Sequence, residues 1–464
     1  MLGKTRKIHF VGIGGIGMSG IAELLLNQGF KISGSDISES EVTRDLTSKG
    51  IPVQIGHAAE YVVDADVVVK SSAVNDKNPE IIAAFGKKIP VIRRAEMLSE
   101  IMRMSYGIGI AGTHGKTSTT SMVGSVLSAA ELDPTVIVGG KVKNYGSNNL
   151  LGSGKYIVVE ADEFDRSFLT LSPIIAGITN IEADHLDCYK DLNGVKQAFI
   201  EYANKVPFFG SVIVCLDDKG VRSIIPEINK KIITYGFSQQ ANIRAEKIQF
   251  QNFCSSFEVH AYDKLMGEVE LNVMGEHNIL NALLAIATGL ELDIDFDSIR
   301  TGLKNYNGVF RRFEFKGSAQ GITIYDDYAH HPTEIEVTLK GVRNSTDKRI
   351  IAVFQPHLYS RTQDFYQEFG RSFFECDLLV VTPIYPARER PIKNVSGKMI
   401  ADAAVQSGHK NVIYIEQNAE IVEKLQEITT EGDIVISMGA GDIYQYAETF
   451  LQTLEKLHEN GKKN

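Results

Sequence analysis

The sequence predicts an α/β protein of three domains, each built on a largely parallel sheet. Apolar strand segments alternate with segments of helical periodicity along most of the chain, which is typical of a parallel sheet covered by helices. The chain has 464 residues, too many for one ordinary core. Two glycine-rich segments each follow a strand and open a helix, which places ligand sites at the carboxyl edges of the first two sheets.

The strand and helix signals divide the chain at about residues 105 and 312. Domain 1–105 and domain 106–312 are separated where a new apolar strand begins, and a polar connection over residues 305–312 precedes domain 313–464. Strands are expected at 7–11, 66–70, 90–92, 156–159, 174–179, 211–215, 349–354, 378–382 and 434–437, and helices at 18–27 and 278–291.

Composition excludes several function classes. The net charge of −10 gives no general attraction to nucleic acid or to an anionic membrane, so an anionic ligand needs a local site. The cysteines are scattered without a Cys-x-x-Cys pair, which predicts buried thiols and neither disulfides nor a zinc site: Cys188, Cys215, Cys254 and Cys376. No apolar run spans a bilayer, and a strand with a glycine-rich turn stands where a signal peptide would lie, so a cytoplasmic protein without a membrane partner is expected.

The segment 111–118 predicts a site for a nucleoside triphosphate. An apolar strand leads into a loop whose backbone amides would hold phosphate oxygens: Gly112, Thr113, His114, Gly115, Lys116, Thr117 and Ser118. Lys116 would reach the outer phosphates, and the Thr117 hydroxyl would ligate Mg²⁺. Ile110 stands where the usual pattern has glycine, so this loop is a shortened variant.

The first glycine-rich loop, at residues 12–17, predicts a diphosphate site. Gly14, Gly15 and Gly17 allow a diphosphate to approach the backbone at the start of a helix. Asp36 ends the next strand and is either an acceptor for a ribose hydroxyl or a solvated turn residue. NAD and a UDP-sugar both carry a diphosphate, so the loop alone does not distinguish them; the second, ATP-type loop argues against a simple dehydrogenase.

Acidic residues at two further strand ends predict metal sites. Glu160 follows the strand 156–159 and would share Mg²⁺ with Thr117. Asp162, Glu163 and Asp165 are either further magnesium ligands or, for at least two of them, charges at a helix start. His185 lies among acids in the segment 179–187 and could be a second metal ligand.

The ordered motifs of the chain resemble those of the Mur ligase family over essentially its whole length. The segments that carry this resemblance are 12–20, 34–36, 93–98, 112–120, 160–163, 179–187, 276–282, 307–309, 311–313, 326–334, 355–357 and 439–442. The resemblance implies Rossmann-like N-terminal and C-terminal domains around a central phosphate-loop ATPase domain. It also implies a cytoplasmic monomer or homodimer.

The resemblance further implies an ATP-dependent ligation. ATP would phosphorylate the lactyl carboxylate of UDP-N-acetylmuramate, and the amine of L-alanine would attack the acyl phosphate, leaving an amide, ADP and phosphate. Lys116, His185, His330 and His331 are the implied catalytic residues, and Thr117, Glu160 and His185 the magnesium ligands. Nucleotide contacts are implied for the phosphate loop and for Asn278, Asn281, Arg312 and Asp327. Substrate contacts are implied for the first glycine loop and for Ser35, Asp36, Ser71, Arg93, Tyr328, His357 and Arg361.

The chain departs from the family pattern at Phe164, Arg166, Phe310 and Leu358. Some sister ligases bind magnesium through a carbamylated lysine, and Glu201 is expected to supply that charge here. Three alternatives compete: a recycling member of the family that attaches a tripeptide, a nucleotide-binding regulatory module without turnover, and a dehydrogenase. The small glycine loop at 12–20 favours L-alanine over the tripeptide, because recycling members carry a bulkier, cysteine-bearing loop.

Overall fold

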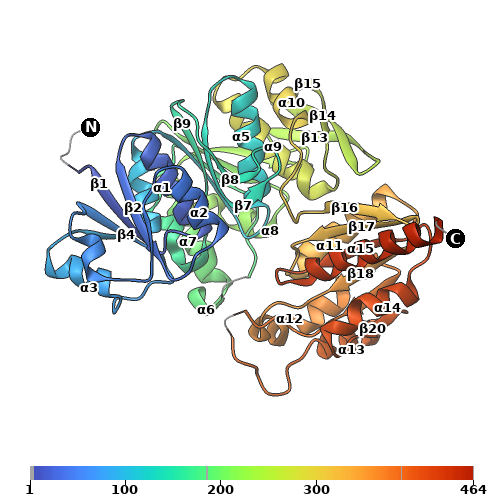
Figure 1. The fold of residues 1–464 in the computed structure, drawn as a ribbon. Coiled ribbons are helices and arrows are strands. Elements are labelled where there is room, and N and C mark those ends of the chain that lie inside the picture. The colour runs from blue at the N-terminus through green and yellow to red at the C-terminus, as the bar shows by residue number, and fades with distance from the viewer. Residues whose placement is uncertain (1–4, 184–185, 388, 463–464) are drawn as a thin grey trace. The chain divides into compact units, whose positions relative to one another are not determined.

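The structure is a computed structural model that describes residues 5–183, 186–387 and 389–462. It contains three β-sheets with helices around them, which confirms the α/β fold with mainly parallel strands (Figure 1). The chain divides into two compact units. The first comprises Met1–Lys247, Phe257–Val269 and Leu280–Tyr306, and the second comprises Ile248–Ser256, Glu270–Ile279 and Asn307–Asn464.

The first sheet has five parallel strands in the order β3-β2-β1-β4-β5. Its strands are β1 (Lys7–Val11), β2 (Lys31–Asp36), β3 (Val53–Ile55), β4 (Val67–Lys70) and β5 (Val91–Arg93). Its helices are α1 (Ile16–Asn27), α2 (Glu41–Ser48), η1 (Ala59–Val62), α3 (Pro79–Gly86) and α4 (Arg94–Arg103). The strand order reverses beside β1, so the loops after β1 and β4 open a crevice at the carboxyl edge.

Local sequence signals explain the helix starts in this domain. The Ser40 side chain caps α2 in a capping box with Thr43, and Asn78 caps α3, whose first residue is Pro79. Helix α1 begins at Ile16, two residues before the predicted start, because Gly15 already serves as its N-cap.

The second sheet has ten strands in the order β15-β14-β13-β12-β11-β10-β6-β9-β7-β8. Its strands are β6 (Tyr106–Ala111), β7 (Thr135–Val142), β8 (Ser147–Leu150), β9 (Tyr156–Glu160), β10 (Ile175–Ile178), β11 (Ser211–Cys215), β12 (Lys231–Gly236), β13 (Ile243–Gln251), β14 (Cys254–Ala261) and β15 (Lys264–Leu271). Its helices are α5 (Lys116–Ala129), η2 (Phe164–Thr170), α6 (Leu186–Tyr189), α7 (Leu192–Asn204), α8 (Lys219–Ile224), η3 (Ile225–Glu227), α9 (Glu276–Glu291) and α10 (Phe296–Lys304).

Strand β6 pairs in parallel with both β9 and β10, so the carboxyl ends of these three strands are neighbours. The segments that follow these three strands lie side by side at the carboxyl edge, and they carry the phosphate loop, Glu160 and residues 179–183. The strands β7, β8 and β12 to β15 were not predicted individually, because their exposed positions break the continuous apolar pattern of buried parallel strands.

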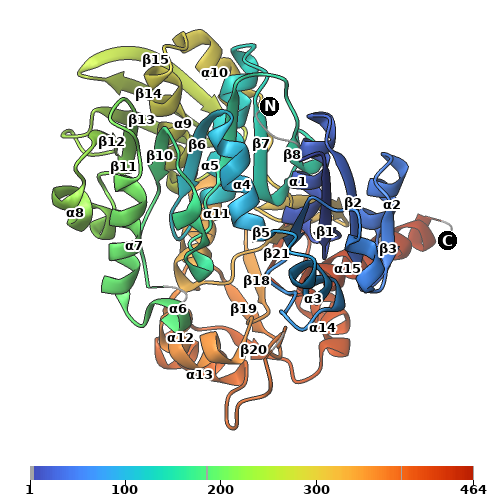
Figure 2. The ribbon, with the colours of Figure 1, turned by 90° about the vertical axis from the view of Figure 1, so that its left-hand side faces the viewer.

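One continuous core joins the first sheet to the second within the first unit. Met18 of α1 and Leu98 of α4 belong to the same buried cluster as Ile137 of β7 and Phe168 of η2. Helix α1 contacts β7 and β8, and the same arrangement is visible in Figure 2. The two glycine-rich loops are therefore held on one body.

The third sheet, in the second unit, has the order β16-β17-β21-β18-β19-β20, with β16 antiparallel at one edge. Its strands are β16 (Glu314–Ala319), β17 (Ile322–Asp327), β18 (Ile350–Phe354), β19 (Leu378–Val381), β20 (Val412–Tyr414) and β21 (Ile434–Met438). Its helices are α11 (Pro332–Ser345), α12 (Tyr359–Arg371), α13 (Lys398–Gln406), η4 (Asn418–Glu420), α14 (Ile421–Ile428) and α15 (Ile443–Lys462). Two buried clusters, one on each side of β17, β18 and β21, form its core.

The four cysteines are unpaired thiols, as predicted, but only two of them are buried. Cys215 and Cys376 lie in the core, Cys188 is half-buried, and Cys254 is exposed at the start of β14. Among the described residues, none of the helices combines the length and the apolar character needed to cross a membrane.

Candidate functional site

The phosphate loop between β6 and α5 requires glycine at two positions. Gly115 is the N-cap of α5 at φ +80°, and Gly112 has φ +139°, a conformation that L side chains rarely adopt. A Cβ on Gly112 would lie 1.9 Å from the Thr179 Oγ1 atom. The absent side chains leave the loop backbone open at the N-terminus of α5, where a phosphate is stabilised.

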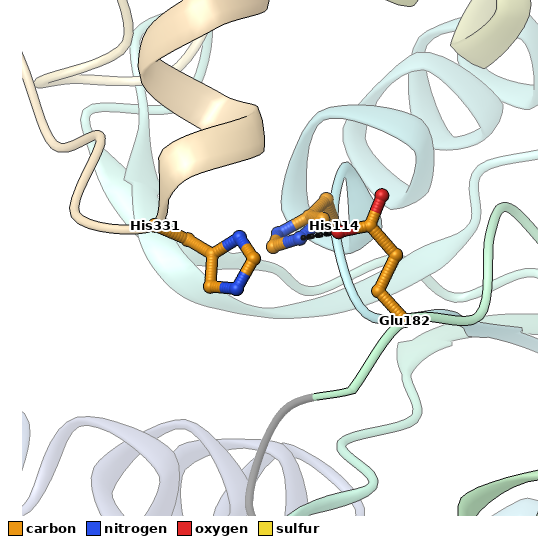
Figure 3. Close-up of side chains that lie close together, drawn as sticks. All are labelled: His114, Glu182 and His331. Carbon is orange, nitrogen blue, oxygen red and sulfur yellow. Dashed lines mark ion pairs between the residues drawn. The ribbon is translucent and has the colours of Figure 1, made fainter. Parts of the chain in front are cut away.

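The segment after β10 fixes the shape of this loop. The His114 amide donates to Asn180 Oδ1 at 2.8 Å, the Thr113 amide donates to the Asn180 carbonyl at 3.0 Å, and the Thr179 hydroxyl donates to the His114 carbonyl at 2.6 Å. His114 Nε2 also lies 3.4 Å from Glu182 Oε2, the pair joined by a dashed line in Figure 3. The motif 179–187 therefore supports the loop through its first four residues.

Lys116 is held by three acceptors inside the loop. Its ammonium donates to the Gly112 and Thr113 carbonyls at 2.7 and 3.1 Å and to Glu163 Oε2 at 2.7 Å. Burial disfavours the lysine charge, but the nearby carboxylates, Glu163 above all, outweigh burial and raise the Lys116 pKa to about 12. The lysine is therefore a permanent cation in the place where phosphates are expected.

Glu163 has a partner that the sequence did not predict, the ammonium of Lys116. It is the N-cap residue of η2, but its side chain makes no cap hydrogen bond and turns to Lys116. Burial raises the Glu163 pKa, which Lys116 opposes. Its Oε1 atom is buried and has no hydrogen-bond partner among the described residues. Asp162 does act at the helix start, where its Oδ1 accepts from the Phe164 amide at 3.2 Å.

Thr117 and Glu160 lie together as a pair of hard oxygen ligands. The Thr117 hydroxyl donates to Glu160 Oε2 at 2.9 Å, and the Gly139 amide donates to the same oxygen at 2.7 Å. A hydroxyl and a carboxylate are oxygen donors of the kind that Mg²⁺ takes beside phosphates, so Thr117 and Glu160 fit the ion. His185 and the side chain of Asp165 lie outside the described residues, and the expected metal role of His185 stays a prediction.

The two asparagines of α9 have different surroundings. Asn281 lies against the phosphate loop, because a Cβ on Gly115 would be 2.6 Å from its Oδ1 atom. Asn278 donates through Nδ2 to the Met274 carbonyl at 2.8 Å, and the same nitrogen lies 3.1 Å from His277 Nε2. Both adenine contacts stay predictions.

A pocket of about 660 Å³ opens at the carboxyl edge of the first sheet. It gathers Gly14, Gly15, Asp36 and Ser71, four of the residues expected to contact the sugar nucleotide, together with His57. Asp36 Oδ2 accepts from the Gly14 amide at 2.8 Å, so the acid shapes the glycine loop as well as facing the pocket. The pocket suits a nucleoside diphosphate.

Beneath this pocket lies a buried network that the sequence analysis missed. Glu80 is fully buried and contacts His9 Nε2 at 2.7 Å, His57 Nδ1 at 2.7 Å and the Ser35 hydroxyl at 2.8 Å. Burial alone would raise the Glu80 pKa, but these hydrogen bonds together lower it. The Ser35 side chain thus supports the site from below, and its expected substrate contact stays a prediction. The only sequence signal for Glu80 is the helix start Asn78-Pro79 before it.

A second pocket, of about 250 Å³, lies between the two sheets of the first unit. Gly17 and Arg94 line it from the first domain, and Gly139, Glu160 and Asp162 line it from the central domain. The neighbouring Arg93 is exposed and lines neither pocket. The sequence motif 93–98 identified the segment, but Arg94 is the residue that faces a pocket.

In the second unit, Asp327 is buried and the half-buried Arg312 lies close enough to oppose the rise in its pKa. Asp327 accepts from the Phe313 and Ala329 amides at 2.8 and 2.7 Å, and burial raises its pKa to about 6. Arg312 Nη1 lies 3.3 Å from Glu334 Oε1, while Glu334 Oε2 accepts from the His330 amide at 3.0 Å. Glu334, on the first turn of α11, therefore orients both Arg312 and His330.

The expected amino-acid contacts of this unit gather around His330. Its ring lies edge-on to Tyr328 at 5.3 Å and to His357 at 6.0 Å between centroids. Burial, reinforced by Arg361, lowers the pKa of His357 to about 4, and burial likewise lowers that of His330 to about 4, so both rings are neutral near pH 7. His331, also drawn in Figure 3, is the N-cap of α11 and packs edge-on to Phe365. The roles of all these residues stay predictions.

The departures from the family pattern fall on exposed or strained positions. Arg166 Nη2 lies 3.9 Å from Glu201 Oε2, and Lys205 also pairs with Glu201 at 3.6 Å. Phe164 and Phe310 are exposed, and Leu358 caps α12 at φ +72°. The expectation that Glu201 supplies the charge of a carbamylated lysine stays a prediction.

Comparison with known proteins assigns the family. Residues 7–106 match the Mur ligase family catalytic domain, residues 110–289 the Mur ligase middle domain, and residues 311–441 the Mur ligase glutamate ligase domain. The chain belongs to the Mur ligase family. This confirms the family resemblance and the ligase prediction, and it removes the dehydrogenase and the regulatory module.

Individual Mur ligases resemble the chain over nearly its full length. The UDP-N-acetylmuramate--L-alanine ligase of Salinibacter ruber is 51% identical over 98% of this chain and 96% of its own length. A solved UDP-N-acetylmuramate-alanine ligase from Thermotoga maritima is 31% identical, with a TM-score of 0.78 over 97% of this chain and 99% of that one. A murein peptide ligase from Psychrobacter arcticus shares the fold at 23% identity, with a TM-score of 0.68 over 97% and 98% of the two chains.

Proposed function

We propose that this Mur ligase joins L-alanine to the lactyl carboxylate of UDP-N-acetylmuramate, with ATP converted to ADP and phosphate. The observation that carries the proposal is the 250 Å³ pocket, which is lined by Gly17 of the first glycine loop and by Glu160 of the expected magnesium site. A sugar whose diphosphate is held at residues 12–17 can therefore extend toward the phosphate loop. The carboxylate would reach the place where ATP presents its terminal phosphate.

The residues of the first unit fit phosphoryl transfer to a carboxylate. The loop amides hold the triphosphate, and Lys116 places a positive charge beside the transferring group, where charge spreads over its oxygens. Thr117 and Glu160 would hold Mg²⁺, which when bound neutralises phosphate charge. The acyl phosphate formed would then be attacked by the alanine amine, with phosphate leaving.

L-alanine is preferred to the tripeptide as the acceptor because of the named relatives and of the first glycine-rich loop. The relative at 51% identity carries the alanine-ligase name, and the likeness to the murein peptide ligase supports the fold alone. The small loop at residues 12–20 agrees with alanine. We also expect a cytoplasmic protein that works as a monomer or homodimer.

Phosphate release tests this function. The protein is assayed with ATP, Mg²⁺ and UDP-N-acetylmuramate, and L-alanine, glycine, L-serine and the tripeptide L-Ala-γ-D-Glu-diaminopimelate are compared as acceptors. We expect release that requires the UDP-sugar and prefers L-alanine, with the amide product identified by mass. Turnover with the tripeptide alone would assign the recycling reaction instead.

A further inference from the structure

The 250 Å³ pocket has an uneven distribution of charge. Glu160 and Asp162 place two carboxylates on the side of the central domain, and Arg94 is the one basic residue in the lining. An anionic substrate entering this pocket is repelled by the acids until a metal ion offsets them. Arg94 is the cation that the protein itself provides there.

Gly17 allows Arg94 to lie against the start of α1. A Cβ on residue 17 would be 3.0 Å from Arg94 Nη1 and 3.2 Å from its Cδ atom, closer than ordinary contact. The guanidinium therefore rests beside the loop that is expected to hold a diphosphate. This contact gives a reason for glycine at position 17 that is separate from backbone conformation.

Arg94 is half-buried but has no carboxylate within ion-pair distance among the described residues. Arg103, on the same helix, is exposed and pairs with Glu100 at 2.7 Å. Removing a charge from water without a partner is unfavourable, so an unpaired arginine in a pocket is suited to an anion supplied by a ligand. Its planar fork of donors matches two oxygens of a phosphate or a carboxylate.

We infer that Arg94 binds an anionic oxygen of the sugar nucleotide at the junction between the glycine loop and the 250 Å³ pocket. The inference rests on the proposed function and adds to it the residue that holds the substrate's charge. Two groups of the substrate carry suitable oxygens: the diphosphate and the lactyl carboxylate. The experiment separates these sources.

Binding of UDP-N-acetylmuramate and of UDP-N-acetylglucosamine, which lacks the lactyl carboxylate, is measured by calorimetry for the wild type and for Arg94→Ala, Arg94→Lys and Arg103→Ala. Loss of a charge-assisted hydrogen bond predicts roughly 10- to 100-fold weaker binding for Arg94→Ala, partial recovery for Arg94→Lys and no change for Arg103→Ala. Weaker binding of both ligands assigns Arg94 to the diphosphate, and weaker binding of UDP-N-acetylmuramate alone assigns it to the carboxylate.

Unchanged binding of both ligands by Arg94→Ala would overturn the inference while leaving the proposed function standing. A wild-type protein that binds neither UDP-sugar would overturn both. ATP affinity and the thermal midpoint of unfolding serve as controls for folding. If Arg94 had a merely structural role, its variants would change both quantities and would weaken the binding of both UDP-sugars equally.

Discussion

The ammonium of Lys116 lies 2.7 Å from the carboxylate of Glu163, inside the loop that is expected to bind the phosphates of ATP. The two side chains are 12% and 3% exposed, so solvent screens the pair little. A bound triphosphate must either accept a hydrogen bond from Lys116 beside Glu163 or displace Glu163 from the lysine. Glu163 thus competes with the nucleotide phosphates for the ammonium of Lys116.

Glu163→Gln is expected to tighten ATP binding about 3- to 10-fold, because a like charge next to the phosphates is removed while Lys116 keeps its two carbonyl partners. The KM for the UDP-sugar should not change. Fluorescent-nucleotide titration measures the first quantity and steady-state kinetics the second. Weaker ATP binding would instead indicate that Glu163 positions Lys116 for the nucleotide.

Lys116→Ala is expected to lower kcat at least about 1,000-fold, because the positive charge beside the transferring phosphoryl group is lost. The variant also leaves Glu163 buried without its partner, so it should unfold at lower temperature. Glu163→Gln combined with Lys116→Ala removes that unpaired charge and should restore the thermal midpoint without restoring activity. Recovery of activity in the double variant would contradict the role given to Lys116.

Thr117→Ala is expected to raise the Mg²⁺ concentration needed for half-maximal activity about 10-fold, since one oxygen ligand of the expected site is lost. Thr117→Ser keeps the hydroxyl and should behave as the wild type. Ser128→Ala, at an exposed position of the same helix, is the matched control. An unaltered Mg²⁺ requirement in Thr117→Ala would exclude this hydroxyl from the metal site.

Local sequence patterns identify some of the site residues, whereas others are identified only by contacts between distant segments. Lys116, Thr117 and Glu160 follow from local rules: glycine spacing, a helix start and a strand end. Arg94 is missed as one of two adjacent arginines, and Glu163 is left open between a magnesium ligand and a helix-start charge, because no local pattern shows that its side chain meets Lys116. Only the folded chain shows that the Glu163 side chain meets Lys116 and that Arg94 lies against Gly17.

Glu80→Ala is expected to destabilise the first unit by about 3–5 kcal/mol, because His9, His57 and Ser35 lose a shared buried acceptor. Hydrogen bonds hold the Glu80 pKa below its usual value, so the charged form is favoured in the folded state. The contribution of Glu80 is therefore fully present above its unfolded pKa, and it is lost as pH falls from there through the lower pKa of the folded state. Calorimetry measures the free energy of unfolding of wild type, Glu80→Ala and Glu80→Gln near pH 7 and near pH 4. The difference between the wild type and either variant should shrink at the lower pH, and a constant difference would contradict the prediction.

Asp327 is expected to change the free energy of unfolding with pH in the direction opposite to Glu80. Burial raises its pKa from 3.8 to about 6, so the folded state favours the protonated acid. Its stabilising effect is complete below about pH 4 and is lost as pH rises to about 6, a change of up to about 3 kcal/mol. Urea denaturation measures the free energy of unfolding. From about pH 4 to about pH 6 it should fall in the wild type relative to Asp327→Asn, in which residue 327 does not titrate. Parallel profiles of the two proteins from pH 4 to 7 would show that Asp327 stays ionised in the folded state, with the Phe313 and Ala329 amides outweighing the cost of burial.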